Sequence, residues 1–256
     1  MEYLIIDIGN TNIVFAVYNE KKILQKWRIS TLIKRTMDEY ILWFSSTIKK
    51  NIQFKDIIIG SVVPDITEEL KLAIFSFFKK KPLVVSEDFK VNFPINVDNP
   101  AEVGTDRLVN SLCAWNTYQK PSIIVDFGTA TTFDVVGKEG VYLGGVIAPG
   151  INLSMSALHT AAARLPRIAI TKPKSIIGKN TVSAMSSGVY WGYVGLINCL
   201  LTKIEEEIGY KMSIIATGGL ANLFVSEMPK SIIINNNLTI HGLYISYKES
   251  KNTNEK

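Results

Sequence analysis

Cysteine and histidine are scarce in this chain of 256 residues, which contains two of each. Cys113 and Cys199 each lie in an apolar, helix-like stretch with no other cysteine or histidine at ligand spacing. We therefore expect both to pack in the core, because isolated cysteines behave as small apolar residues. His159 and His241 are too few and too far apart to form a zinc site.

Long apolar runs are also missing. None reaches the roughly 18 residues that a bilayer-spanning helix needs, and the first residues, Met1-Glu2-Tyr3, lack the basic segment that opens a secretion signal. We therefore expect a cytoplasmic protein with no membrane partner.

Positive charge is not concentrated either. The net charge is +5, but lysine and arginine are scattered. The densest cluster, Lys79-Lys80-Lys81, follows an expected helix, where cations favour the helix dipole. We interpret it as solvated surface rather than a nucleic-acid site, although a mildly positive protein would still attract a polyanionic substrate.

Several nucleotide and hydrolase motifs are absent. The chain has no Gly-x-x-x-x-Gly-Lys-Ser/Thr run, no protein-kinase glycine loop with its lysine and His-Arg-Asp partners, and no Gly-x-Ser-x-Gly elbow. The first absence excludes a Walker-type site, and the other two leave the chain without the signatures of a protein kinase or an α/β-hydrolase.

The composition is that of a globular protein, with 47% hydrophobic and 20% charged residues. The length leaves room for two cores. Because strand and helix patterns alternate, we expect an α/β protein with two domains, residues 1–118 and 119–248, followed by a flexible tail at 249–256.

Two stretches repeat one pattern, residues 4–17 and residues 124–136. In each, an apolar run ends in an aspartate, Asp7 or Asp126, then come one apolar residue, a glycine, small polar residues and a second apolar run. This pattern predicts a β-hairpin whose turn amides suit phosphate oxygens and whose aspartate suits the accompanying cation. One such turn is ordinary turn chemistry, but two copies indicate two phosphate loops facing across a cleft.

Further elements follow from apolar periodicity and from glycine and proline punctuation. Strands are expected at residues 23–29, 56–63, 82–86, 142–148 and 212–217, helices at 36–50, 65–79, 101–118, 152–163 and 181–208, and a loop at 89–100. In the last of these helices Gly188, Gly192 and Gly195 stand among large apolar residues, which permits close approach of another helix or a partner chain.

The segment Gly104-Thr105-Asp106-Arg107 opens an expected helix. Asp106 can be a simple helix cap there. A carboxylate base beside an arginine, whose planar fork binds carboxylate or phosphate, is also what phosphoryl transfer to a small acidic alcohol requires. Gly218-Gly219, after a buried strand, suits close passage of a nucleotide, although a bare Gly-Gly turn is weak evidence.

Two hairpins and a Gly-Gly turn in this order resemble the acetate and sugar kinase, Hsp70 and actin superfamily. That resemblance implies two duplicated ribonuclease-H-like domains with mixed central sheets and ATP between them. Within the superfamily the chain resembles type III pantothenate kinase over nearly its whole length. The motifs that carry the match are Asp7-Ile8-Gly9-Asn10-Thr11, Asn99-Pro100, Glu102-Val103-Gly104-Thr105-Asp106-Arg107, Asp126-Phe127-Gly128-Thr129-Ala130-Thr131-Thr132, Gly145-Val146-Ile147-Ala148-Pro149-Gly150 and Gly178-Lys179-Asn180-Thr181.

The resemblance implies ATP as co-substrate, with Mg²⁺ held indirectly by Asp7 and a monovalent cation, potassium or ammonium, held by Asp126. It implies further ATP contacts from Thr129 and, in the Gly-Gly turn, from Gly218 and Gly219. The first phosphate loop would comprise Asp7, Ile8, Gly9, Asn10, Thr11, Asn12, Ile13 and Val14.

For the other substrate, pantothenate, the resemblance implies that Asp106 accepts the hydroxyl proton. Gly104, Thr105 and Arg107 would frame the substrate, and Thr181 would reach the partner subunit's site in a homodimer. Val97 stands where many relatives carry a pantothenate-contacting tyrosine, and valine packs but cannot donate a hydrogen bond.

We therefore expect ATP-dependent phosphorylation of pantothenate to 4'-phosphopantothenate, the first step of coenzyme A biosynthesis. Two alternatives stay open. One is a non-catalytic regulatory accessory protein of the same family, against which the intact Asp7, Asp106 and Asp126 argue. The other is an ATP or polyphosphate phosphohydrolase on the same fold, which would not need the Gly-Thr-Asp-Arg segment.

Overall fold

The structure is a computed structural model, and it describes all residues except 49–51, 162–165, 167 and 255–256. It separates into two compact units. Unit 1 comprises Met1–Pro94, Asp98–Asn116 and Asn237–Lys256, and unit 2 comprises Ile95–Val97 and Thr117–Asn236.

Unit 1 contains a mixed five-stranded sheet. The expected hairpin forms, since β1 and β2 pair antiparallel, and β3 extends it into a meander. β4 then pairs parallel to β1 and β5 parallel to β4, which gives the order β3-β2-β1-β4-β5. The strands are β1 (Glu2–Ile8), β2 (Asn12–Tyr18), β3 (Ile23–Ser30), β4 (Phe54–Ser61) and β5 (Leu83–Val84).

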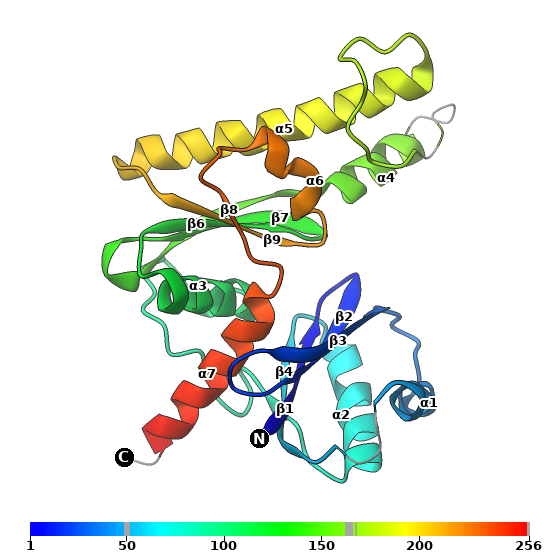
Figure 1. The fold of residues 1–256 in the computed structure, drawn as a ribbon, viewed down its shortest axis with the longest axis vertical. Helices are drawn as coiled ribbons and strands as arrows, with labels where there is room; N and C mark the ends of the chain where they lie inside the picture. The colour runs from blue at the N-terminus through cyan, green and yellow to red at the C-terminus, as the bar shows by residue number, and fades with distance from the viewer. Residues whose placement is uncertain (49–51, 162–165, 167, 255–256) are drawn as a thin grey trace. The chain divides into compact units, whose positions relative to one another are not determined.

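Helices cover both faces of this sheet (Figure 1). Leu4, Ile6 and Ile8 of β1 pack with α1 (Met37–Thr47) and α2 (Pro64–Phe78). The alternate residues Tyr3 and Ile5 pack with α3 (Thr105–Tyr118) and α7 (Leu238–Asn254). The strand alternation therefore feeds two cores, as expected for a sheet buried on both sides.

Unit 2 repeats the strand plan in the order β10-β9-β6-β7-β8. β6, β7 and β8 form the antiparallel meander, while β9 pairs parallel to β6 and β10 parallel to β9. The strands are β6 (Ser122–Phe127), β7 (Ala130–Val136), β8 (Tyr142–Pro149), β9 (Ser213–Gly218) and β10 (Ile233–Ile234).

One face of the second sheet packs against the long helix α5 (Thr181–Ile208) and the short α6 (Ala221–Phe224) (Figure 1). Phe127 of β6 stacks on Phe224 with ring centroids 5.8 Å apart. α4 (Ile151–Ala161) follows β8 directly and contacts α5. Short 3₁₀ turns occupy Pro100–Glu102, Lys138–Gly140 and Val225–Glu227.

The predicted fold class is confirmed, because the chain forms two mixed five-stranded sheets flanked by helices. Among the described residues no helix is long and apolar enough to cross a membrane.

Several expectations need correction. The tail expected to be flexible, residues 249–256, is helical through Asn254, because it continues α7, which packs in unit 1 through Leu243 and Tyr247. Residues 255–256 lie outside the described residues. The domain boundary at 248 differs accordingly, since Asn237–Lys256 groups with unit 1. Cys113 is buried as expected, but Cys199 is exposed on α5. Lys80 is half-buried rather than fully solvated, because its ammonium donates to the Phe54 carbonyl at 3.3 Å.

Candidate functional site

The first hairpin turn is a short loop at the carboxyl end of β1. Asp7 is half-buried at the strand end, opposite Val14 of β2, and the Gly9 amide donates to the Asn12 carbonyl at 3.0 Å. Thr31 fixes the loop from outside, since its hydroxyl donates to the Gly9 carbonyl at 2.6 Å and its amide to the Thr11 carbonyl at 2.9 Å. The turn is thus held with the polar residues Asn10 and Thr11 exposed.

Asp106 lies in the first turn of α3 and is half-buried. Its Oδ1 accepts a hydrogen bond from the Arg107 amide at 2.9 Å. A Cβ at Gly104 would come within 2.6 Å of the same oxygen, so a larger residue there would displace the carboxylate. Gly104 therefore permits the position of Asp106, which supplies a physical reason for this part of the motif.

A hydrogen bond brings the start of α3 to the sheet edge that carries Asp7. The hydroxyls of Ser86 and Thr105 lie 2.7 Å apart, and Ser86 follows β5. Because β1, β4 and β5 run parallel, their carboxyl ends share one edge of the sheet. Two strand spacings, about 10 Å, separate β1 from β5. Asp7 and Asp106 thus belong to one edge of unit 1.

The second hairpin turn consists of Gly128 and Thr129, both exposed between β6 and β7. Gly150 supports it, because its amide donates to the Thr129 carbonyl at 3.2 Å and a Cβ on it would lie within 2.3 Å of that oxygen. The Pro149-Gly150 end of the sequence motif is thereby explained by contact with the turn.

Asp126 is half-buried at the carboxyl end of β6. It lies directly opposite Thr132 of β7 and beside Thr217 of β9. Gly218 follows with φ +90°, and a Cβ on it would lie 2.5 Å from Asp126 Oδ1. The structure thus brings together Asp126, the Gly128-Thr129 turn and the Gly218-Gly219 turn at one edge of unit 2.

Val97 is half-buried and belongs to unit 2. The Asn96 amide donates to the Tyr142 carbonyl at 2.8 Å, and Val97 lies 3.7 Å from where a Cβ on Gly144 would stand. The segment Ile95–Val97 is therefore attached to β8.

Thr181 belongs to the long helix α5 of unit 2. It is exposed at the start of α5, after the N-cap Asn180, whose side chain accepts from the Ser183 amide at 2.9 Å. Tyr193 of α5 contacts Thr131, next to the second turn. Twelve helical residues separate Tyr193 from Thr181, a distance of about 18 Å along the axis. Thr181 is thus well separated along α5 from the residue that contacts β7.

The oxygen atoms at and around Asp126 are suitable ligands for a hard monovalent cation. Its carboxylate has the hydroxyls of Thr132 and Thr217 as strand neighbours, and oxygen ligands suit such ions. Within the described part of the chain, no group of three or more histidine, cysteine, aspartate or glutamate side chains could hold a metal ion. Asp7, at the end of β1, fits Mg²⁺ that is bound mainly through substrate phosphates.

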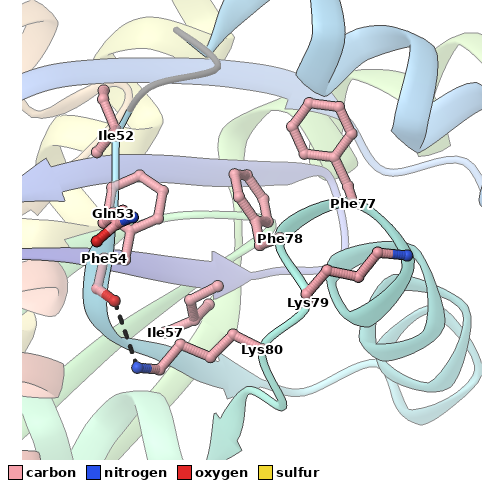
Figure 2. A pocket seen from close by; sticks show the side chains of 8 residues that line it. All are labelled: Ile52, Gln53, Phe54, Ile57, Phe77, Phe78, Lys79 and Lys80. Atoms are coloured by element: carbon pink, nitrogen blue, oxygen red, sulfur yellow. Dashed lines mark hydrogen bonds between the residues drawn. The ribbon is translucent and has the colours of Figure 1, made fainter.

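A pocket of about 590 Å³ lies between the start of β4 and the end of α2 (Figure 2). Phe54, Phe77 and Phe78 line it together with Lys79 and Lys80. β4 is parallel to β1, with Phe54 beside Glu2 and Ser61 beside Ile8. The pocket therefore lies at the edge of the sheet opposite Asp7, away from the residues expected to bind ATP.

Sequence reasoning missed several residues that hold the site. Thr31 and Ser86 follow strands without any motif, and only tertiary contacts reveal their role. Asp134 is a fully buried carboxylate that accepts hydrogen bonds from Tyr142 and Thr132. A charged residue inside the apolar run of β7 was the one available signal.

The sequence profile of a family described as type III pantothenate kinase matches residues 3–203. The chain belongs to the type III pantothenate kinase family. It is 49% identical to the type III pantothenate kinase of Acidiphilium cryptum, over 94% of this chain and 92% of that protein. It is 48% identical to that of Paramagnetospirillum magneticum, over 94% of each.

Solved structures share the fold at lower identity. A protein from Campylobacter jejuni, described as a Baf family transcriptional activator, superposes with a TM-score of 0.60 at 20% identity, over 97% of this chain and 99% of that one. The activator of 2-hydroxyisocaproyl-CoA dehydratase from Clostridium difficile, with bound ADPNP, gives 0.56 at 13% identity, over 100% and 98%. These likenesses support the duplicated actin-like fold.

Proposed function

We propose that this chain transfers the γ-phosphoryl group of ATP to the hydroxyl of pantothenate, giving 4'-phosphopantothenate in the first step of coenzyme A biosynthesis. The observation that carries the proposal is the Ser86–Thr105 hydrogen bond, which joins Asp106 to the sheet edge of Asp7. A base and a phosphate loop at one edge are what in-line phosphoryl transfer needs. Because the proposed reaction consumes ATP, we propose that the enzyme is cytoplasmic.

In the proposed mechanism, the two turns and the Gly218-Gly219 segment hold the nucleotide. Asp106 accepts the substrate hydroxyl proton at its carboxylate as the γ-phosphoryl passes to that oxygen. Gly104, Thr105 and Arg107 bind and orient pantothenate, with the guanidinium suited to its carboxylate. Asp7 would hold Mg²⁺ indirectly and Asp126 potassium or ammonium, and these ions supply neutralisation of phosphate charge when bound.

The test is an ADP-release assay with ATP, magnesium and potassium, with and without pantothenate. We expect ADP only when pantothenate is present, and one phosphopantothenate for each ADP. ADP release at the same rate without pantothenate would favour the phosphohydrolase alternative. No turnover under any of these conditions would favour the regulatory alternative, and a regulator would keep its effect in the Asp106→Asn variant.

We further propose a homodimer that uses the exposed face of α5. Small residues recur on this face at helical spacing. A Cβ added to Gly188, Gly192 or Gly195 would meet no atom of the described chain within 4 Å. Exposed apolar side chains, Ile176, Ile177 and Val182, lie at the same end of the helix as Thr181. The small exposed residues of this face are Ala184, Gly188, Gly192, Gly195 and Cys199.

Gly192→Leu tests the dimer. In a helix interior leucine is more favourable than glycine by about 1 kcal/mol. Loss of the dimer in light scattering would therefore reflect the blocked face rather than unfolding. Ser45→Leu, on the exposed face of α1, is the matched control and should leave the mass unchanged. A wild-type monomer, or a Gly192→Leu dimer, would contradict the proposal.

A mixing experiment tests whether Thr181 acts across the interface. Asp106→Asn and Thr181→Arg chains are each expected to be inactive alone. After random exchange, half of the dimers are mixed and each has one intact site, so about a quarter of wild-type activity should return. No recovery, with exchange verified by mass, would mean that Thr181 serves its own chain or no site.

A further inference from the structure

Asp134 is a carboxylate in the middle of β7 with 0% exposure. Its strand neighbours Phe133 and Val135 belong to the core beneath α5. Since successive side chains of a strand alternate, Asp134 lies on the opposite face of the sheet. A buried carboxylate destabilises the fold unless hydrogen bonds replace the lost water, so packing alone does not account for it.

Two hydroxyls bind the two carboxylate oxygens separately. Tyr142, itself 1% exposed, donates to Asp134 Oδ1 at 3.0 Å, and Thr132 donates to Oδ2 at 3.1 Å. Tyr142 comes from the adjacent strand β8, so it holds the carboxylate against the sheet. Thr132 lies two residues before Asp134, toward the second turn.

Thr132 is also the direct cross-strand partner of Asp126. Opposed residues of an antiparallel pair lie on the same face, with Cβ atoms about 5 Å apart. One cation can therefore contact oxygens of both side chains. Asp134 thus touches the residue that stands beside the expected cation ligand.

The hydrogen bond decides which way the Thr132 proton points. Thr132 has a single hydroxyl proton, and it donates this proton to Asp134. The oxygen lone pairs of Thr132 are then left for other partners. An oxygen acceptor beside the Asp126 carboxylate suits a bound cation.

Unit 1 offers a built-in comparison. The residue opposite Asp7 is Val14, and two positions further along that strand stands Ala16. Unit 2 has Thr132 and Asp134 at the corresponding places. The hydroxyl and its carboxylate acceptor accompany only the aspartate that the family resemblance assigns to a monovalent cation.

We propose that Asp134 is a positioning residue that orients Thr132 as a second oxygen ligand for the monovalent cation at Asp126. The proposal rests on the proposed cation site and deepens it. In outer-shell positions of this kind, removing the orienting partner typically weakens metal binding by about 10-fold to 100-fold.

The test is the potassium dependence of thermal unfolding, measured without substrates against choline chloride at matched ionic strength. Asp134→Asn keeps the shape but can donate to Thr132, which frees the threonine proton to point at Asp126. We expect it to raise the potassium concentration for half-maximal stabilisation by about 10-fold or more. Thr132→Val removes the oxygen itself and should have an equal or larger effect.

Tyr193→Phe is the matched control, because it removes a buried hydroxyl that contacts Thr131 on the other face of the same strand. It should lower the melting temperature without moving the potassium titration. The double variant Thr132→Val/Asp134→Asn should titrate like Thr132→Val alone, since Asp134 acts through Thr132.

Equal melting losses in Asp134→Asn and Tyr193→Phe, with unchanged potassium titrations, would reduce Asp134 to a structural role and overturn the proposal. If Asp134→Asn does not fold, Thr132→Val decides, and an unchanged titration there overturns the proposal as well. Wild-type protein that potassium does not stabilise would instead overturn the cation assignment at Asp126, and this proposal with it. Phosphorylation of pantothenate is assayed in a separate experiment, so failure of the cation proposal can be distinguished from failure of the proposed kinase function.

Discussion

The two sheets share one strand plan but differ around their aspartates. Asp7 has Val14 opposite it and Gly60 beside it, whereas Asp126 has Thr132 and Thr217 in the same places. The face of the first sheet on which Asp7 lies is covered by apolar side chains of α7, and the corresponding face of the second sheet carries Asp134. A repeated hairpin thus gives the carboxylate of unit 1 strand neighbours without side-chain oxygen and the carboxylate of unit 2 two threonine hydroxyls.

This difference suggests a division of work. Unit 1 combines its carboxylate with Asp106 at the same edge, which suits the chemical step. Unit 2 surrounds its carboxylate with hydroxyls, which suits direct contact with a cation.

The largest effect is expected from Asp106→Asn. Loss of a positioned general base should lower kcat about 1,000-fold, while the potassium-dependent rise in melting temperature should be unchanged, because the proposed cation site lies in unit 2. Steady-state kinetics and thermal unfolding on the same preparation check this. A variant that keeps more than a tenth of wild-type kcat would argue that Asp106 is only a helix cap.

Gly60, beside Asp7 in unit 1, corresponds to Thr217, beside Asp126 in unit 2. Gly60→Thr therefore gives unit 1 the residue found in unit 2. A Cβ there would lie 2.4 Å from the buried Leu243 side chain of α7, so the substitution should over-pack this face. Such changes cost about 1–3 kcal/mol, measured by urea unfolding. Adding Leu243→Ala should make the cost of the threonine smaller, and an additive loss would show that the two residues do not compete for space.

Gly218→Ala and Gly209→Ala form a matched pair. Both glycines have positive φ, +90° and +79°, but a Cβ on Gly218 would meet Asp126 Oδ1 and the Phe127 backbone, whereas one on Gly209 would meet open space. Gly209→Ala should cost about 1 kcal/mol from backbone strain. Gly218→Ala should cost more and also weaken the potassium response. Equal costs with an unchanged response would show that the close approach to Asp126 has no consequence.

The smallest effect concerns pH. Burial, and secondarily the nearby Lys26, lowers the pKa of His241, which packs edge-on against Tyr18 in unit 1. The folded state therefore favours neutral His241, so its contribution is present above the unfolded pKa of about 6.5 and is lost as pH falls. His241→Gln should flatten the fall in stability between pH 7 and 5 by about 1 kcal/mol or less. A steeper fall in the variant would reverse the sign.

Much of this architecture could be predicted from the sequence. Apolar runs around Asp-x-Gly turns predicted both hairpins, and the parallel strands 56–63 and 212–217 correspond to β4 and β9. These features depend on local patterning, which a single sequence displays.

What the sequence did not reveal depends on contacts between distant segments. Helix α7 was not predicted, because the end of the chain is polar. The role of its apolar residues is evident only from their packing on the first sheet. The exposure of Cys199 follows from which side of α5 faces its sheet, and apolar content alone does not tell this. Thr31, Ser86 and Asp134 are ordinary residues until the fold brings them to their partners.

The most direct test of the division of work is the potassium dependence of pantothenate-stimulated ADP formation in the wild type, Asp126→Asn and Asp7→Asn, measured side by side. We predict saturable activation by potassium in the wild type, none in Asp126→Asn, and retained activation in Asp7→Asn with a raised magnesium requirement. A potassium titration of Asp126→Asn that matches the wild type would contradict the account.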